Sequence, residues 1–244
     1  MLAGIVCAAP DIGITMREGG IVRGDACILA MDFETGIADD LSGKGNDGTV
    51  IGATFVAATG LSSGAVRFDG VNDYISIDDH DTIEELSEIT LSAWAYFKVQ
   101  SQAAEDTIFD KWGFGKKGLQ LRYDSANNQI DFFVGKYSDS AEVSNGVSVE
   151  GGWHHVCATW DTTSNKMKVY VDGEKLPNEG TFSAHTTIIY KEDDLNLWIG
   201  EYHGAPRRDP FKGSIDEVLI YNDSLTASEV KDLYRSGMIR HPNP

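Results

Sequence analysis

The sequence predicts an all-β protein: an antiparallel β-sandwich of the jelly-roll type with one short C-terminal helix. Three observations support this prediction. Apolar and polar residues alternate with a period of two along most of the chain. Clusters of Gly, Asn and Asp separate the alternating runs at fairly regular intervals. A helical pattern with its own start and stop signals stands out once, near the C-terminal end.

The chain length fits one such sandwich. A single all-β domain commonly reaches about 200–250 residues, and this chain has 244. Hydrophobic residues make up 41% and charged residues 24%, which is typical of a globular protein with a real core. We expect one domain over residues 26–237 and a loose N-terminal arm, a possible signal remnant, over residues 1–25. Residues 238–244 would form a tail.

The strands are expected where alternation is cleanest. These runs are 89–97, 130–134, 166–171, 195–199 and 215–221. Asp172 and Gly173 follow one of them and supply the pair of positive-φ residues that a two-residue hairpin turn requires. The sequence therefore predicts a tight hairpin at this point.

The single helix begins with a capping box. The Thr226 hydroxyl can accept from the backbone N–H of Glu229, whose carboxylate can reach back to Thr226. Val230, Leu233 and Tyr234 then share one helical face, and Gly237 is a natural stop. We expect a short helix lying on the sandwich.

The charge is strongly acidic. There are 20 Lys and Arg against 38 Asp and Glu, a formal net charge of −18. Such a surface repels nucleic acids, anionic lipids and sulfated glycans, and it attracts cations. We therefore expect no nucleic-acid partner. Acidity that only supports solubility is an equally good interpretation.

The cysteine content limits the possible disulfides, and the hydropathy limits the possible membrane spans. Cys7, Cys27 and Cys157 are too few and too widely spaced for a disulfide framework, so at most one bridge can form. Cys157 lies in an apolar run and is expected to be a buried, inert thiol. No apolar run approaches the roughly 18 residues of a membrane span.

Several segments, read in order, resemble a laminin-G-like domain of the concanavalin A-like lectin/glucanase superfamily. The resemblance covers about residues 26–237 and supports the same jelly-roll fold. The segments that carry it are residues 28–34 (ILAMDFE), 40–48 (DLSGKGNDG), 66–75 (VRFDGVNDYI), 89–94 (ITLSAW), 153–161 (WHHVCATWD), 169–173 (VYVDG) and 213–222 (GSIDEVLIYN).

The resemblance implies a calcium ion where the first strand, the glycine-rich loop and the last long strand meet. The matching positions are Asp32, Glu34, Asn46 and Asp216. Carboxylate and carbonyl oxygens are the ligands that calcium prefers. In the alternative interpretation, Asp216 accepts only backbone N–H groups while Asp32 and Glu34 face water.

The histidine pair and the contiguous acids do not predict catalysis. Adjacent strand residues point to opposite faces, so His154 and His155 should not share a metal ion, and the resemblance makes them fold signature residues. The acids Asp216–Glu217 and 192–194 are contiguous as well, and should diverge in a strand. Nothing reproduces the spaced acid pair of a glycosidase, so we expect no enzyme.

Aromatic residues in polar or glycine-rich loops indicate ligand binding. Sugar rings stack on aromatic faces, while their hydroxyls need nearby donors and acceptors. The candidate ligand-binding residues are Trp112, Phe114, Tyr202, His203 and Arg207. The alternative is that such rings only hold loops in place. Trp94, Trp153 and Trp160 lie in the signature strands and are expected in the core.

Together these observations predict a non-catalytic, lectin-like module that binds a carbohydrate or glycoprotein, with a structural calcium. We expect it to be secreted, extracellular or at the cell surface, as such modules often are. A protein–protein adhesion domain that binds no free sugar is the alternative. A glycoside hydrolase or lyase is a third, weaker hypothesis.

Overall fold

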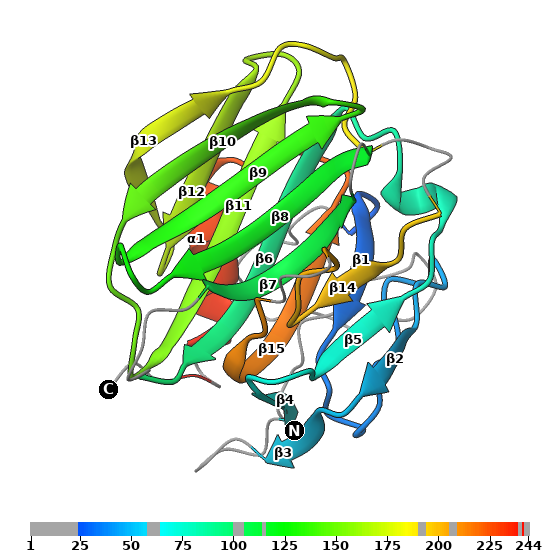
Figure 1. Cartoon of the computed structure of the whole chain (residues 1–244), viewed down its shortest axis with the longest axis vertical. Coiled ribbons are helices and arrows are strands. Elements are labelled where there is room, and N and C mark those ends of the chain that lie inside the picture. Colours follow the sequence, from blue (N-terminus) through cyan, green and yellow to red (C-terminus); the bar gives the residue numbers. More distant parts are fainter. Residues whose placement is uncertain are drawn as a thin grey trace.

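A computed structural model describes residues 24–57, 64–99, 105–113, 116–189, 194–204, 209–238 and 241. These residues form a β-sandwich with one α-helix (Figure 1). The strands are β1 (Cys27–Met31), β2 (Gly48–Ile51), β3 (Thr54–Ala57), β4 (Gly64–Asp69), β5 (Tyr74–Ile77), β6 (Glu88–Phe97), β7 (Glu105–Gly113), β8 (Lys116–Asp124), β9 (Gln129–Lys136), β10 (Asp139–Gly146), β11 (Trp153–Asp161), β12 (Lys166–Val171), β13 (Glu174–Thr181), β14 (Leu197–Ile199) and β15 (Lys212–Tyr221). The helices are a 3₁₀ turn, η1 (Asp81–Ile83), and α1 (Ala227–Gly237).

The strands form two antiparallel sheets. Sheet A has the order β13-β12-β11-β6-β15-β4-β3, with β1 also paired to β15, and sheet B has the order β10-β9-β8-β7-β14-β5-β2. Helix α1 lies behind sheet A in the view of Figure 1, whereas sheet B faces the viewer. The predicted antiparallel sandwich with one C-terminal helix is confirmed.

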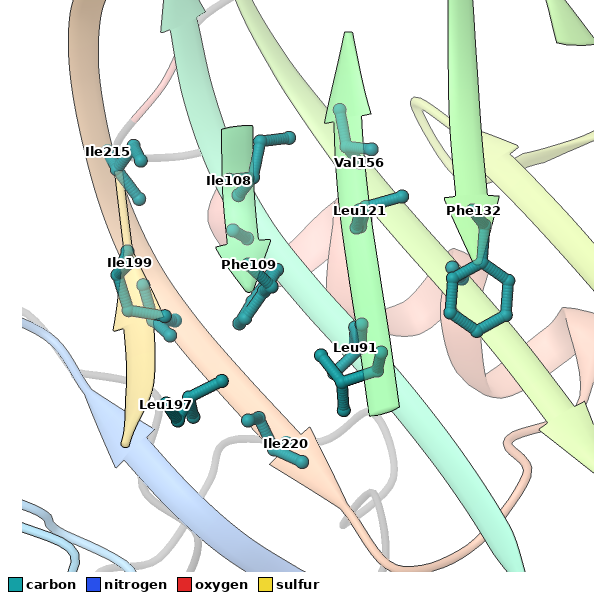
Figure 2. Packing of buried hydrophobic residues seen from close by; sticks show 14 of the residues in the cluster. Leu91, Ile108, Phe109, Leu121, Phe132, Val156, Leu197, Ile199, Ile215 and Ile220 are labelled. Carbon is teal, nitrogen blue, oxygen red and sulfur yellow. The ribbon is translucent and has the colours of Figure 1, made fainter. Parts of the chain in front are cut away.

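The main core lies between the sheets. Figure 2 shows side chains of both sheets facing one another in this layer, among them Leu91, Val156, Ile215 and Ile220 of sheet A. Phe109, Leu121, Phe132 and Ile199 are among those from sheet B. All eight are fully buried. The period-two alternation exists because each strand must turn one side toward this layer.

A second, smaller core lies between sheet A and α1. Val230 and Leu233 of the helix pack with Cys157 and Tyr170 of the sheet. Central strand β6 is therefore buried on both faces, which is why polar Thr90 and Ser92 are also inaccessible. Cys157 is a free, buried thiol, as expected, and burial raises its pKa.

The local signals in the sequence produce the local structures that they predict. Asp172 and Gly173 have φ values of 51° and 74° and connect β12 to β13 in a tight hairpin. Thr226 caps α1, and both halves of its capping box with Glu229 are formed. Trp94 and Trp160 are fully buried, whereas Trp153 is half-buried at the start of β11. The described residues include no helix of sufficient length and hydrophobicity to traverse a lipid bilayer.

Candidate functional site

One row of residues crosses the outer face of sheet B. Strand pairing places Phe133 beside Gln120, Gln120 beside Asp110, Asp110 beside Trp198, and Trp198 beside Ser76. Their chain neighbours point into the main core, so these side chains point away from it. Neighbouring strands are about 4.8 Å apart, so Phe133 and Trp198 are separated by roughly 14 Å.

An aromatic pair with a cation forms one end of this row. Trp112 and Phe133 meet edge to face with ring centroids 5.9 Å apart. The Arg122 guanidinium lies 4.9 Å from the centre of the Phe133 ring, a distance that allows cation–π attraction. Arg122 is also paired with Glu105 and with Asp131, its Nε being 3.3 Å from the Asp131 carboxylate. These contacts fix the guanidinium beside the rings.

Three stacked rings form the other end. Tyr74 and Trp198 stack at 4.2 Å, and Trp198 and His203 stack at 4.0 Å with planes only 17° apart. All three residues are half-buried, so part of each remains accessible. Burial and the charge of Lys111 both lower the pKa of His203, which favours its neutral, stackable ring.

Buried Asp110 connects the two ends. Its Oδ1 accepts from Gln120 Nε2 at 3.0 Å, and its Oδ2 accepts from the backbone N–H of His203 at 3.0 Å. The backbone N–H of Trp112 also donates to it. Burial raises the pKa of Asp110 to about 8, although these hydrogen bonds oppose the shift. One side chain thus holds Trp112 and His203 in fixed positions relative to each other.

We define the sheet-B face as these outward-facing residues and the His203 loop. Its members are Tyr74, Asp110, Trp112, Gln120, Arg122, Phe133, Trp198 and His203. It combines accessible aromatic rings with a few fixed polar groups. That composition suits a ligand with apolar ring faces and peripheral hydroxyls.

The structure brings together two of the five predicted ligand-binding residues. Trp112 and His203 are both on the sheet-B face, and half-buried Tyr202 precedes His203 in the same loop. Phe114 and Arg207 lie outside the described residues, as do Glu192 and Asp193 of the second acidic run.

Sequence reasoning missed Tyr74, Asp110, Phe133 and Trp198. The signal for Phe133 and Trp198 was present, because each is an aromatic residue at a position that alternation assigns to the outer, normally polar face. Asp110 carried no such signal, because its burial results from the loop that follows β14.

The four predicted calcium ligands do not form one group. Asn46 is buried and donates from Nδ2 to the carbonyl of Ile28 at 2.6 Å and to the Thr82 hydroxyl at 2.9 Å. Asp32 accepts from the backbone N–H of Glu34 at 3.2 Å. Among the described residues, Asp32 and Glu34 belong to no cluster of metal-ligating side chains. The calcium site at these positions stays a prediction, because calcium also accepts amide and backbone carbonyl oxygens as ligands.

The glycine-rich loop has a structural explanation instead. Asp40 accepts from the backbone N–H groups of Ala30, Ser42 and Asn46 and from the Ser42 hydroxyl, at 2.8–3.0 Å. The carboxylate therefore organises the loop around itself and anchors it to β1. The DLSGKGN motif is explained by these hydrogen bonds.

Asp216 and Glu217 do not diverge as the alternation rule predicts. The register of β15 against β6 shifts between Asp216 and Leu219, and Glu217 has a φ of 48°. This β-bulge turns both carboxylates to the same region, where their oxygens and a His241 ring nitrogen all lie within 4.8 Å of one another. The expectation failed because a positive-φ residue interrupts the period of two.

The histidine pair has separate partners, as expected. His155 Nε2 is 2.9 Å from the Ser92 hydroxyl, and burial lowers the pKa of His155 to about 4. His154 Nδ1 is 2.8 Å from Asp172 Oδ2, while Asp172 Oδ1 accepts from the backbone of His155. The WHHV and VDG motifs are thereby joined by the hairpin aspartate.

Sequence relatives include proteins of the pentraxin type. C-reactive protein 1.4 of Limulus polyphemus is 25% identical over 172 residues, which cover 66% of this chain and 66% of that protein. Neuronal pentraxin-2 of Cavia porcellus is 24% identical over 62% of this chain and only 35% of its own length. This chain therefore spans less than two thirds of the relatives that it matches.

Solved structures share the fold. Domain 4 of AbnA, a GH43 extracellular arabinanase from Geobacillus stearothermophilus solved with arabinotriose, matches with a TM-score of 0.62 and 20% identity, covering 85% of this chain and 98% of that chain. The ligand binding domain of botulinum neurotoxin serotype D, solved with N-acetylneuraminic acid, matches with a TM-score of 0.69 and 16% identity, covering 88% of this chain and 52% of that chain. At these identities the likeness establishes the fold alone.

A family model settles the classification. The model for Laminin_G_3, described as the concanavalin A-like lectin/glucanases superfamily, matches residues 69–231, which is about two thirds of the chain. The matched region contains the whole sheet-B face and the WHHV and IDEV segments discussed above. The chain belongs to this family of concanavalin A-like, laminin-G-like domains.

Proposed function

We propose that this protein is a non-catalytic carbohydrate-binding module whose ligand occupies the sheet-B face. The observation that carries the proposal is the bridge made by Asp110. It fixes Trp112 and His203 by their backbone N–H groups, and so holds two aromatic clusters at a defined separation. Rings that are fixed in advance lose little conformational entropy when a ligand stacks on them.

A cation at one end of the face suits hydroxyl recognition. Arg122 lies on an outward position of β8 beside the Phe133 ring, whereas Gln120 is only 5% exposed and donates to Asp110. The Arg122 guanidinium can donate in pairs to neighbouring hydroxyls of one sugar ring. The roughly 14 Å between Phe133 and Trp198 suits a short oligosaccharide rather than a single ring.

The charge favours neutral sugars. A net charge of −18 opposes the approach of sulfated or carboxylated glycans. The AbnA domain, whose structure contains arabinotriose, shares this fold over nearly its whole length. We therefore choose neutral oligosaccharides as the ligand class, with arabinotriose as the first probe.

An extracellular location fits one structural neighbour. The AbnA domain that shares this fold belongs to an arabinanase described as extracellular. We propose that the protein acts outside the cell or at its surface, where glycans and glycoproteins are accessible.

The test uses two half-buried tyrosines on opposite faces. Tyr74→Ala removes a ring of the sheet-B stack, whereas Tyr96→Ala removes a comparable ring on sheet A, where Tyr96 contacts Trp153. Calorimetric titration with arabinotriose and a panel of neutral oligosaccharides should show affinity reduced about tenfold by Tyr74→Ala, since stacking is worth about 1 kcal/mol or slightly more. Tyr96→Ala should bind like the unaltered protein.

A glycan array, run with calcium and with EDTA, completes the test. Binding that survives EDTA is expected, because the sheet-B face contains none of the four predicted calcium ligands and its rings are held by hydrogen bonds to Asp110. Incubation with the bound sugar should release no product. If no glycan binds either with calcium or with EDTA, the proposal is rejected and a protein–protein adhesion domain is favoured.

A further inference from the structure

We propose that Asp216, Glu217 and His241 form a buried binding site for a divalent transition-metal ion of the zinc class. Each offers one ligand atom, and these atoms lie within 4.8 Å of one another. His241 Nε2 is 3.0 Å from Asp216 Oδ2. The site lies on the side of sheet A that faces α1, so it is separate from the sheet-B face.

The backbone produces this convergence. Consecutive strand residues normally point to opposite faces. At Glu217 the backbone takes a φ of 48°, and the register against β6 shifts between Asp216 and Leu219. Positive φ costs a non-glycine residue free energy, and such strain gathers where a specific side-chain placement is needed. Here it places two carboxylates beside one imidazole.

The donor set indicates the class of metal. One imidazole nitrogen and two carboxylate oxygens are ligands that zinc and similar ions accept at about 2.0–2.2 Å. Calcium needs six to eight oxygen ligands and does not favour imidazole. Asp216 and His241 are 0% exposed and Glu217 is 2% exposed, which leaves little room for the waters that calcium would require.

A buried donor points into the same space. Trp94 is 1% exposed, and its Nε1 has no hydrogen-bond partner within the described part of the chain. A Cβ on Gly237 would stand 2.0 Å from Trp94 Nε1 and 2.7 Å from Glu217 Oε2. The indole N–H and the carboxylate thus lie against the same side of Gly237, where the side chain of any other residue would collide with them.

Aromatic rings hold the imidazole in position. The His241 ring is 4.9 Å from Trp94 and 4.3 Å from Trp153, measured between centroids. Its backbone N–H donates to the carbonyl of Gly237 at 3.0 Å. A metal ion at this point would tie the chain beyond α1 to strand β15, and would act as a clamp on the helix.

The experiment measures metal binding on the full chain. Protein stripped with EDTA and dialysed is titrated with zinc in a calorimeter, and its thermal unfolding is followed with and without zinc. We expect one ion per chain and a midpoint raised by about 5–10 °C when free zinc exceeds its dissociation constant about 100-fold. Calcium and magnesium should give no comparable shift.

A second readout locates the ion. Cobalt(II) in the same site should quench tryptophan fluorescence, because the rings of Trp94 and Trp153 contact His241. Zinc added afterwards should restore the emission by displacing cobalt.

Two variants and one control decide the outcome. His241→Phe keeps a ring beside the tryptophans but no ligand atom, and Glu217→Gln keeps side-chain shape without the charge. His185→Phe is the control, since His185 also contacts aromatic rings and one carboxylate, Asp139, on a different part of the surface. Loss of stoichiometric zinc binding in both variants and its retention in the control would support the site. Absent binding, or binding unchanged in a folded Glu217→Gln protein, would overturn it.

Discussion

The outer faces of the two sheets use similar residue types for opposite purposes. On sheet A, Trp94 is 1% exposed, and it stacks on Tyr234 beneath α1 at 5.6 Å. On sheet B, Trp198 also stacks on a tyrosine, Tyr74 at 4.2 Å, yet all of these rings stay half-exposed. An aromatic cluster therefore becomes part of the core where a helix covers it, and an accessible surface where none does. Composition alone does not distinguish the two.

The same contrast applies to the buried acids. On the sheet-B face, Asp110 accepts hydrogen bonds from two backbone N–H groups. On the side of sheet A that α1 covers, a β-bulge directs Asp216 and Glu217 toward His241. In both places a carboxylate is removed from water, which is costly unless other groups stabilise it. At the first site the stabilising groups are hydrogen bonds. At the second, the backbone N–H of Glu217 donates to Asp216 Oδ1 at 2.7 Å and His241 Nε2 lies 3.0 Å from Asp216 Oδ2, and our proposal adds a metal ion to these contacts.

Removing the covered tryptophan should have the largest effect on stability. Trp94→Ala deletes a fully buried ring and leaves a cavity under α1, which should lower the free energy of unfolding by about 3–5 kcal/mol. Trp198→Ala should cost far less, because that ring is already half-exposed. Urea unfolding followed by circular dichroism measures both. Equal losses in the two variants would contradict the distinction between the faces.

Asp110 should make stability depend on pH. The carboxyl ionises near pH 3.8 in the unfolded chain and near pH 8 in the fold. Between these values the folded state holds a proton that the unfolded state has lost. The free energy of unfolding should therefore fall as the pH rises from about 4 to about 8, by up to about 1.4 kcal/mol per pH unit.

Asp110→Asn should remove this pH dependence of the free energy of unfolding, because a carboxamide stays neutral and its oxygen still accepts hydrogen bonds from the backbone. The variant should match the unaltered protein at pH 5 and exceed its stability at pH 8. Asp78→Asn, at an exposed carboxyl, is the control and should leave the pH profile unchanged. Parallel profiles for the unaltered protein and Asp110→Asn would show that Asp110 is ionised throughout this range.

Weakening the helix cover should have the smallest effect. Thr226→Ala removes the capping box of α1 and should lower the free energy of unfolding by about 1 kcal/mol. Hydrogen exchange should increase at the first turn of α1 and remain unchanged in β7 to β9 of sheet B. Faster exchange in sheet B as well would mean that the two faces are not independent.

Much of the fold was predictable because its signals are local. Alternation identified β6, β9, β12 and β15, and the Asp172–Gly173 pair identified a hairpin. Thr226 and Glu229 identified the start of α1. Each of these signals depends on residues within a few positions of one another, so one sequence is enough to detect it. The order of the segments also revealed the family.

The candidate site was predictable only in part. Trp112 and His203 were found because aromatic and polar residues in loops indicate ligand contact. Their link through Asp110, and the addition of Phe133 and Trp198, depend on which strands are neighbours. The calcium set stays a prediction; in the structure the side-chain amide of Asn46 donates to Ile28 and Thr82.

Local patterns in the sequence predicted part of the secondary structure, the β-sandwich class and the acidic, aromatic-rich character of the protein. Long-range packing sets which strands lie side by side, which face α1 covers, and where Glu217 interrupts the alternation. The physical reason is that a period of two assigns residues to the faces of one strand but does not select its partners. Pairing of strands far apart in sequence depends on burial over the whole chain, and it is this pairing that creates both sites.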